Sequence, residues 1–189
     1  MNSGHKVMLT LKSMGDLKST TALISGWNVI ETINNSGADI LVELAFTDLK
    51  TGEPALSHVK QALNHGMHVS MTNKGPVALH FPELHKLALR KNVQIGIEGN
   101  VISGTPSLNL GKEMLLAAGI TKIQGILNGT TNYILGEMSS GVDYSVALKQ
   151  AQELGHAEAD PTDDVEGYDA TAKVVILGNL LMDLSLKLD

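Results

Sequence analysis

The feature that most constrains the fold is a regular alternation of short apolar runs with longer segments of helical period. Residues 38–46 (ADILVELAF), 67–73 (MHVSMTN) and 93–99 (VQIGIEG) are short and rich in apolar residues, which is typical of strands buried in a core. Residues 53–66 and 79–92 lie between them and carry apolar residues at the three- and four-residue spacing of a helix. This β-α-β-α-β order requires crossover connections, and it therefore predicts a parallel sheet.

The pattern after residue 99 is less regular. Pro106 suits the first turn of a helix, which we expect to continue to about residue 118. A further strand is predicted over 121–127 (TKIQGIL), and three helices follow it, at about 130–139, 143–154 and 165–182. We place the boundary between two regions within residues 99–106.

The chain is therefore expected to have an α/β fold with two domains. Residues 1–99 form a partial Rossmann-type parallel sheet of the nucleotide-binding kind, and residues 100–189 form an α+β substrate-binding or catalytic domain. Within the first domain, residues 6–12 (KVMLTLK) fit a strand or part of a helix, and we leave both alternatives open.

The composition excludes several classes of protein. A net charge of -6 argues against a nucleic-acid surface, because phosphate binding needs clustered lysine and arginine. No stretch approaches about 18 consecutive apolar residues, so we expect no membrane span. The absence of cysteine excludes disulfides, thiolate nucleophiles and cysteine metal ligands. With 43% hydrophobic residues and no long apolar run at the N-terminus, a globular cytoplasmic protein is expected.

The stretch with the strongest chemical signal is residues 155–173 (GHAEADPTDDVEGYDATAK), where six carboxylates precede one lysine. On a helix, Lys173 shares a face with Ile176 and Leu180, which indicates that its ammonium is partly buried. A buried charge needs a partner, and Asp169 lies four residues earlier on the same face. The structural alternative is an ordinary helical ion pair that contributes about 0.2–0.5 kcal/mol.

Some of these acids have a local explanation. Asp163 and Glu166 fit a capping box at the start of the last helix, and Asp164 is the alternative cap. Glu158 and Asp169 have no such local duty. Two such carboxylates beside a partly buried lysine suit the binding of an amino acid or a proton transfer.

Three turns follow the predicted strands at the edge where open α/β folds bind ligands. They are residues 45–48 (AFTD), 72–76 (TNKGP) and 98–106 (EGNVISGTP). Lys74 in the second turn is either a ligand-binding residue or an exposed turn lysine. Glu98 could simply cap a helix, although the carbonyls of the small residues that follow it would suit a hard cation such as sodium or magnesium.

The sequence of residues 126–135 (ILNGTTNYIL) allows two local structures. Asn128 and Gly129 favour a two-residue hairpin turn. A turn from strand to helix, capped by Thr130 or Thr131, agrees better with the surrounding pattern.

Together these motifs resemble the homoserine dehydrogenase family. The family signature runs A-x3-G, an aliphatic or aromatic residue, a small residue, then D-P-x2-D, a hydrophobic residue, and x-G-x-D-x3-K. The residues of this chain that match it are Ala151, Gly155, Ala157, Glu158, Asp160, Pro161, Asp164, Val165, Gly167, Asp169 and Lys173. TGEPALSHV, TNKGP and ILNGTTNYIL resemble the same family in the expected order, so that the resemblance covers about residues 38–189.

The resemblance implies NAD- or NADP-dependent interconversion of L-homoserine and L-aspartate 4-semialdehyde, a step towards threonine, methionine and isoleucine. It implies that Lys173 is the acid/base residue, assisted by Lys74 and supported by Asp164. Glu158 and Asp169 would bind homoserine. A homodimer or a higher homo-oligomer is expected.

The resemblance also assigns two further sets of residues. One set would contact the cofactor, namely Ala45, Phe46, Asn73, Lys74 and Gly155. The other would bind a monovalent cation, sodium or potassium, namely Glu98, Val101, Ser103 and Thr105.

The chain departs from the family pattern in several respects. His156 stands where the family carries tyrosine or an apolar residue, and Ala45-Phe46 replaces the more usual Thr-Pro. No G-x-G-x-x-G motif is present, so we expect the first βαβ unit to be missing. Because the family normally continues well beyond residue 189, we also expect the catalytic domain to be incomplete at its C-terminus. Two alternatives stay open: a related reductase of another small amino-acid aldehyde, and an inactive remnant that binds a ligand or a partner chain.

Overall fold

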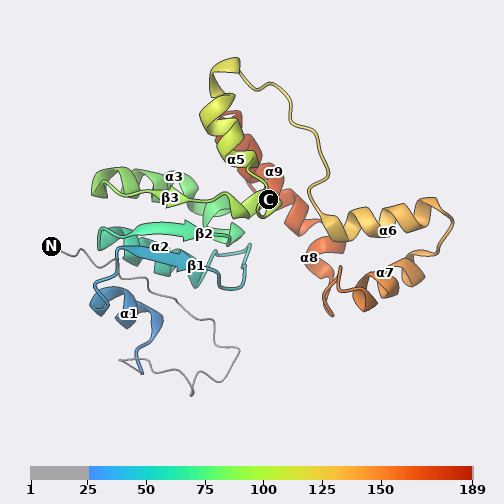
Figure 1. Cartoon of the computed structure of the whole chain (residues 1–189), viewed down its shortest axis with the longest axis horizontal. Helices are drawn as coiled ribbons and strands as arrows, with labels where there is room; N and C mark the ends of the chain where they lie inside the picture. The colour runs from blue at the N-terminus through green and yellow to red at the C-terminus, as the bar shows by residue number, and fades with distance from the viewer. Residues whose placement is uncertain (1–25, 189) are drawn as a thin grey trace. The chain divides into compact units, whose positions relative to one another are not determined.

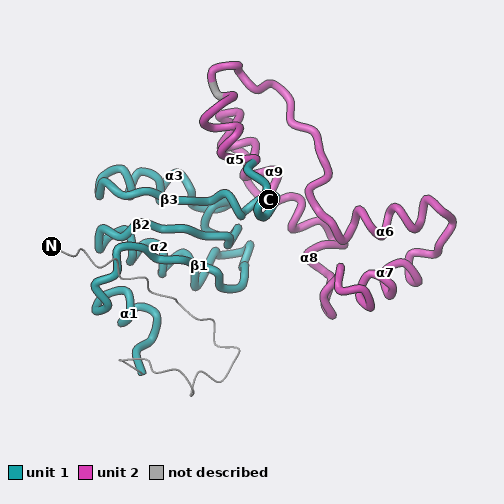
Figure 2. Tube along the Cα trace, viewed as in Figure 1, with its two compact units in different colours: residues 1–106 teal, residues 107–189 magenta. Residues whose placement is uncertain are grey.

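A computed structural model describes residues 26–188, and the chain divides into two compact units, Met1–Pro106 and Ser107–Asp189 (Figure 2). The segment 6–12, for which two alternatives were open, lies outside the described residues. No helix among residues 26–188 has the length and apolar character needed to cross a bilayer.

The first unit is built around a three-stranded parallel sheet, as predicted. Strands β1 (Ile40–Glu43), β2 (His68–Met71) and β3 (Ile95–Gly96) pair in the order β1-β2-β3 (Figure 1). The crossover helices are α2 (Ala55–Asn64) and α3 (Lys74–Lys91), with α1 (Val29–Asn35) before β1 and α4 (Gly99–Ile102) after β3. The predicted α/β class is therefore confirmed.

The core of this unit follows from the apolar spacing in the sequence. Helix α2 buries one complete stripe, consisting of Ala55, Leu56, Val59, Ala62 and Leu63. Only alternate residues of β1 are buried: Leu41 and Glu43 are inside, whereas Ile40 is 49% exposed. The strand expected to be buried throughout is therefore buried on one face.

Helix α3 and strand β3 differ most from their predicted bounds. Helix α3 begins at Lys74 and not at residue 79, because the Asn73 side chain accepts a hydrogen bond from the Gly75 amide (3.1 Å) and caps the helix. Pro76 then occupies the first turn, where no amide hydrogen is needed. Strand β3 has two residues in place of the predicted 93–99, because only these pair with β2.

The described part of the second unit consists of helices. They are α5 (Ser107–Asn109), the π-helical turn η2 (Leu110–Met114), the 3-10 turn η3 (Leu116–Ala118), α6 (Gly129–Ser139), α7 (Tyr144–Glu153), α8 (Thr162–Val165) and α9 (Tyr168–Leu181). Helices α6 and α7 pack around Ile134, Ala147 and Ala151, and Ala157 completes this small core.

Two predicted elements of the second unit are wrong. The helix expected at 106–118 is broken into the three short turns just named. The strand expected at 121–127 does not form, and residues 121–126 are exposed. A strand exists only where its backbone pairs with another strand, and no described residue of this unit offers that pairing.

The predicted helix caps are also corrected. Asn128 caps α6, since its Oδ1 accepts from the Thr131 amide (2.8 Å), so that neither threonine is the cap. The capping box of Asp163 and Glu166 is wrong. Helix α9 begins at Tyr168 after Gly167 (φ 82°) and has no side-chain cap, and Asp163 lies inside the separate helix α8.

Candidate functional site

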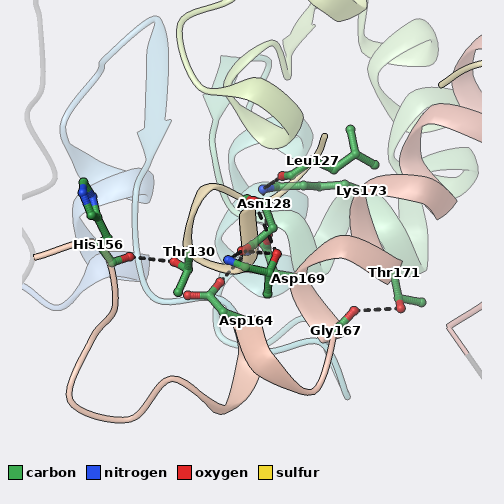
Figure 3. A network of polar contacts seen from close by, with 10 residues as sticks. Leu127, Asn128, Thr130, His156, Asp164, Gly167, Asp169, Thr171 and Lys173 are labelled. Atoms are coloured by element: carbon green, nitrogen blue, oxygen red, sulfur yellow. Dashed lines mark hydrogen bonds and ion pairs between the residues drawn. The ribbon is translucent and has the colours of Figure 1, made fainter. Parts of the chain in front are cut away.

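Lys173 lies in the second turn of α9 with its ammonium almost enclosed. Its Nζ donates to Asp169 Oδ2 (2.6 Å) and to the carbonyl oxygen of Leu127 (2.6 Å), as Figure 3 shows. The side chains of Lys173 and Asp169 are 12% and 14% exposed. The ion pair and the partial burial predicted from spacing are therefore present, whereas the bond to Leu127 could not be foreseen.

The two bonds limit what the lysine can still do. An ammonium has three N–H donors, so that one N–H of Lys173 has no partner among residues 26–188. Both occupied donors end on oxygen atoms that bear full or partial negative charge. The remaining hydrogen can be given to one further oxygen atom.

Asn128 connects the acids around the lysine and was missed as a site residue. Its side-chain amide donates to Asp164 Oδ1 (2.6 Å) and to Asp169 Oδ2 (2.9 Å), as Figure 3 shows. Its Oδ1 accepts from the Thr131 amide. The residue is 7% exposed, and both hydrogens of its amide are used. A helix-capping asparagine inside a recognised motif was the only sequence signal that could have found it.

Asp164 lies in α8 and is not a helix cap. It joins the lysine through Asn128, which bonds both Asp164 and Asp169. The structure thus brings together three of the predicted site residues of this unit, Asp164, Asp169 and Lys173. Asp169 is not a spare carboxylate, because Lys173 and Asn128 both bond its Oδ2.

Glu158 lies in the loop that joins α7 to α8. Gln152 holds this loop by donating to the carbonyl of Glu158 (3.2 Å), and Thr130 holds it by donating to the carbonyl of His156 (2.6 Å). The carboxylate of Glu158 is exposed and has no polar partner among the described residues. It can therefore accept a ligand without losing an existing bond.

Gly155 and His156 precede Glu158 in the same loop. Gly155 has a φ of 76°, and a Cβ placed on it would meet no atom within 4 Å. Its backbone conformation thus favours glycine, and space is open beside it. The His156 ring lies tilted against Tyr133, with 5.1 Å between the ring centroids.

Asp160, which lies just before α8, has a lowered pKa. Asp160 Oδ1 accepts from the hydroxyl (2.6 Å) and the amide (3.2 Å) of Thr162. These bonds, the hydroxyl bond foremost, lower the pKa of the Asp160 carboxyl below its ordinary 3.8.

In the first unit, the predicted cofactor residues gather at the carboxyl end of the sheet. The Asn73 amide donates to the carbonyls of Phe46 (2.7 Å) and Ala45 (3.3 Å), so that the turn after β1 is fixed to the start of α3. Asn73 is 1% exposed. Lys74 is the first residue of α3 and half-buried, so it does not lie in an exposed turn.

The predicted cation residues surround α4. Glu98 precedes this helix without capping it through its side chain, Val101 lies buried within it, and Ser103 (φ 47°) ends it. The Thr105 amide bonds the carbonyl of Ile102 (2.9 Å).

One side-chain oxygen atom in α4 is buried without a hydrogen-bond partner among the described residues. Asn100 is fully buried, and its Oδ1 has no hydrogen-bond partner within the described residues. No cluster of three or more histidine, aspartate or glutamate side chains suited to a metal occurs in residues 26–188.

Comparison with known proteins agrees with the motifs. The family model of homoserine dehydrogenase matches residues 106–189. A protein of Pseudomonas canavaninivorans described as an NAD(+)-dependent homoserine dehydrogenase is 52% identical over 154 residues, which are 82% of this chain and 44% of that protein. A homoserine dehydrogenase of Sulfurisphaera tokodaii is 46% identical over 155 residues, 82% of this chain and 51% of that protein.

Solved structures give the same result. A putative homoserine dehydrogenase from Archaeoglobus fulgidus is 38% identical with a TM-score of 0.71, over 82% of this chain and 48% of that one. A hyperthermophilic archaeal homoserine dehydrogenase in complex with NADPH is 33% identical with a TM-score of 0.75, and the match covers 84% of this chain and 48% of that one. The predicted resemblance is confirmed, and the chain spans about half the length of the relatives it matches.

Proposed function

We propose that this chain, a relative of the homoserine dehydrogenases over about four-fifths of its length, catalyses the NAD- or NADP-dependent interconversion of L-homoserine and L-aspartate 4-semialdehyde. The observation that carries the proposal is the Lys173 ammonium, which Asp169 and the Leu127 carbonyl hold with one N–H left to donate. It lies inside the region that matches the family model.

Lys173 supplies the proton in this reaction. When the aldehyde is reduced, negative charge develops on its oxygen, and the remaining N–H of Lys173 donates to that oxygen. In the reverse direction the amine removes the hydroxyl proton of homoserine. The bound nicotinamide supplies or accepts the hydride. Lys74 assists Lys173, as the family resemblance implies.

The carboxylates divide two tasks between them. Glu158, which has no polar partner among the described residues, binds the ammonium group of the substrate. Asp169 binds the substrate as well and keeps Lys173 in place. Asp164 supports the lysine through Asn128, which we add to the site as a positioning residue.

The cofactor binds at the turn formed by Ala45 and Phe46, with Asn73 and Lys74, and the family resemblance assigns Gly155 to the cofactor as well. Support comes from the fixed geometry of this turn and from the open space at Gly155. The relatives include both an NAD(+)-dependent protein and a structure with NADPH, so both cofactors belong in the test.

A monovalent cation, sodium or potassium, binds in the loop of Glu98, Val101, Ser103 and Thr105. The unpartnered Asn100 Oδ1 beside these residues supports a cation that binds through oxygen. We further propose that the protein acts in the cytoplasm as a homodimer or a higher homo-oligomer. Its reaction would be a step towards threonine, methionine and isoleucine.

The test measures whether the purified chain catalyses the oxidation of NADPH or NADH by aspartate semialdehyde. The loss of cofactor absorbance is the readout. Turnover that Lys173→Ala abolishes supports the proposal. Preference for a different small amino-acid aldehyde indicates the related reductase. No cofactor binding at about millimolar concentration, the weak end of ordinary affinities, indicates a remnant that binds another ligand or a partner chain.

A further inference from the structure

Glu43 is a buried acid that the proposed reaction does not use. It is the last residue of β1 and is 2% exposed. Its Oε1 accepts from the backbone amide of Ala45 (2.7 Å), and its Oε2 lies 2.8 Å from His58 Nδ1. Burying a carboxylate is costly unless both oxygens are bonded, and here both are.

His58 provides the second of these bonds from a different element. It lies on the buried side of α2, and its side chain is 12% exposed. We assign the Nδ1–H tautomer to His58, in which Nδ1 donates to the Glu43 carboxylate. The pair thus joins α2 to the end of β1.

The turn after β1 is held from both sides as a result. Glu43 bonds the Ala45 amide, whereas Asn73 bonds the carbonyls of Ala45 and Phe46. In contrast, the side chains of Leu44 and Phe46 are 55% and 57% exposed. A rigid backbone that presents exposed apolar side chains at the carboxyl end of a parallel sheet is prepared for a ligand.

We infer that Glu43 and His58 are positioning residues that fix the turn of Leu44, Ala45 and Phe46 for the cofactor. The inference rests on the proposed function for the identity of the ligand. It does not depend on that function for the rigidity of the turn. Ordering the turn before the cofactor arrives removes part of the entropy that binding would otherwise cost.

The first experiment measures amide hydrogen exchange by NMR, without any ligand. Glu43→Ala and His58→Leu should accelerate exchange at Ala45 by about tenfold or more, while the β1 amides that pair with β2 keep their rates. His58→Gln keeps a side-chain N–H donor and should restore slow exchange. Lys60→Ala is the control, because it removes an exposed α2 ion pair with Glu83.

The second experiment measures the dissociation constant of NADPH by its fluorescence, and the KM for aspartate semialdehyde. His58→Leu should raise the dissociation constant about three- to tenfold and leave that KM within twofold. His58→Gln and Lys60→Ala should match the unchanged protein.

The outcomes separate two claims: that Glu43 and His58 fix the turn, and that the fixed turn serves the cofactor. Unchanged exchange at Ala45 in both variants overturns the positioning role, as does equal acceleration throughout the first unit, which would make the pair purely structural. Faster exchange at Ala45 with an unchanged NADPH affinity overturns the link to the cofactor. If the unchanged protein fails to bind NADPH, the proposed function fails, and the exchange experiment still decides whether the pair fixes the turn.

Discussion

Lys173 Nζ donates a 2.6 Å hydrogen bond to the carbonyl oxygen of Leu127, 46 residues earlier in the chain. Together with the bond to Asp169, it fixes the ammonium at two points, so that the direction of the third N–H is determined. A simple helical ion pair lacks this second anchor. The proposed catalytic role of Lys173 rests on this second anchor.

Replacement of Lys173 tests this directly. We expect Lys173→Ala to lower turnover by roughly 10²–10⁴, because the developing alkoxide then has no proton donor. Lys149→Ala is a matched control, since Lys149 pairs with Glu153 at the same helical spacing but is 77% exposed. Steady-state kinetics measure both. A loss below tenfold for Lys173→Ala would leave only the structural role.

Asn128 should matter for stability beyond its cap. Asn28→Ala removes a cap of α1 and should cost about 1 kcal/mol in the free energy of unfolding. Asn128→Ala also removes the donor to Asp164 and one of the donors to Asp169, so we expect about 2–4 kcal/mol. Urea unfolding measures both variants. Equal losses would mean that Asn128 is a cap and nothing more.

Glu158 should affect the substrate and not the cofactor. Its carboxylate has no polar partner among the described residues, so Glu158→Gln removes a charge that no protein group needs. We expect the KM for homoserine to rise by about tenfold, the loss of one charged hydrogen bond, with NAD(P)H affinity within twofold. Glu153→Gln, an exposed acid of α7, serves as the control. Similar losses for homoserine and cofactor would assign Glu158 a structural role.

Gly155 allows backbone strain to be separated from cofactor contact. Gly155 (φ 76°) and Gly141 (φ 93°) both have positive φ, and an added Cβ meets no atom within 4 Å at either. Each change to alanine should lower stability by about 1 kcal/mol. Only Gly155→Ala should weaken NADPH binding, measured by fluorescence titration. Equal affinities in the two variants would remove Gly155 from the cofactor site.

Acid should remove the contribution of the Asp160–Thr162 hydrogen bonds, just before α8, to the stability of the fold. Because hydrogen bonds from Thr162 lower the pKa of Asp160 in the folded chain, the ionised form stabilises the fold. That contribution is present above pH 3.8, the ordinary value, and is lost as the pH falls through the lower folded pKa. Thr162→Val removes the hydroxyl, so NMR titration should show the Asp160 pKa rising towards 3.8. An unchanged pKa would show that the hydroxyl bond is not its main cause.

Several features followed from local patterns in the sequence. The β-α-β-α-β order of the first unit was predictable because the spacing of apolar residues within each short segment indicates a strand or a helix. The pairing of Lys173 with Asp169 was predictable for the same reason, since residues four apart share one face of a helix. The cap of α3 at Asn73 also depends only on neighbouring residues, but the predicted strand 67–73 included Asn73 and so hid the cap.

Tertiary structure alone decided the rest. Nothing near Lys173 in the sequence points to Leu127 or Asn128, because the bonds that join them depend on the path of the chain between α6 and α9. Glu43 met His58 through the crossover from β1 to α2. Residues 121–126 had the composition of a strand and formed none, since strand pairing needs a second backbone that composition cannot supply.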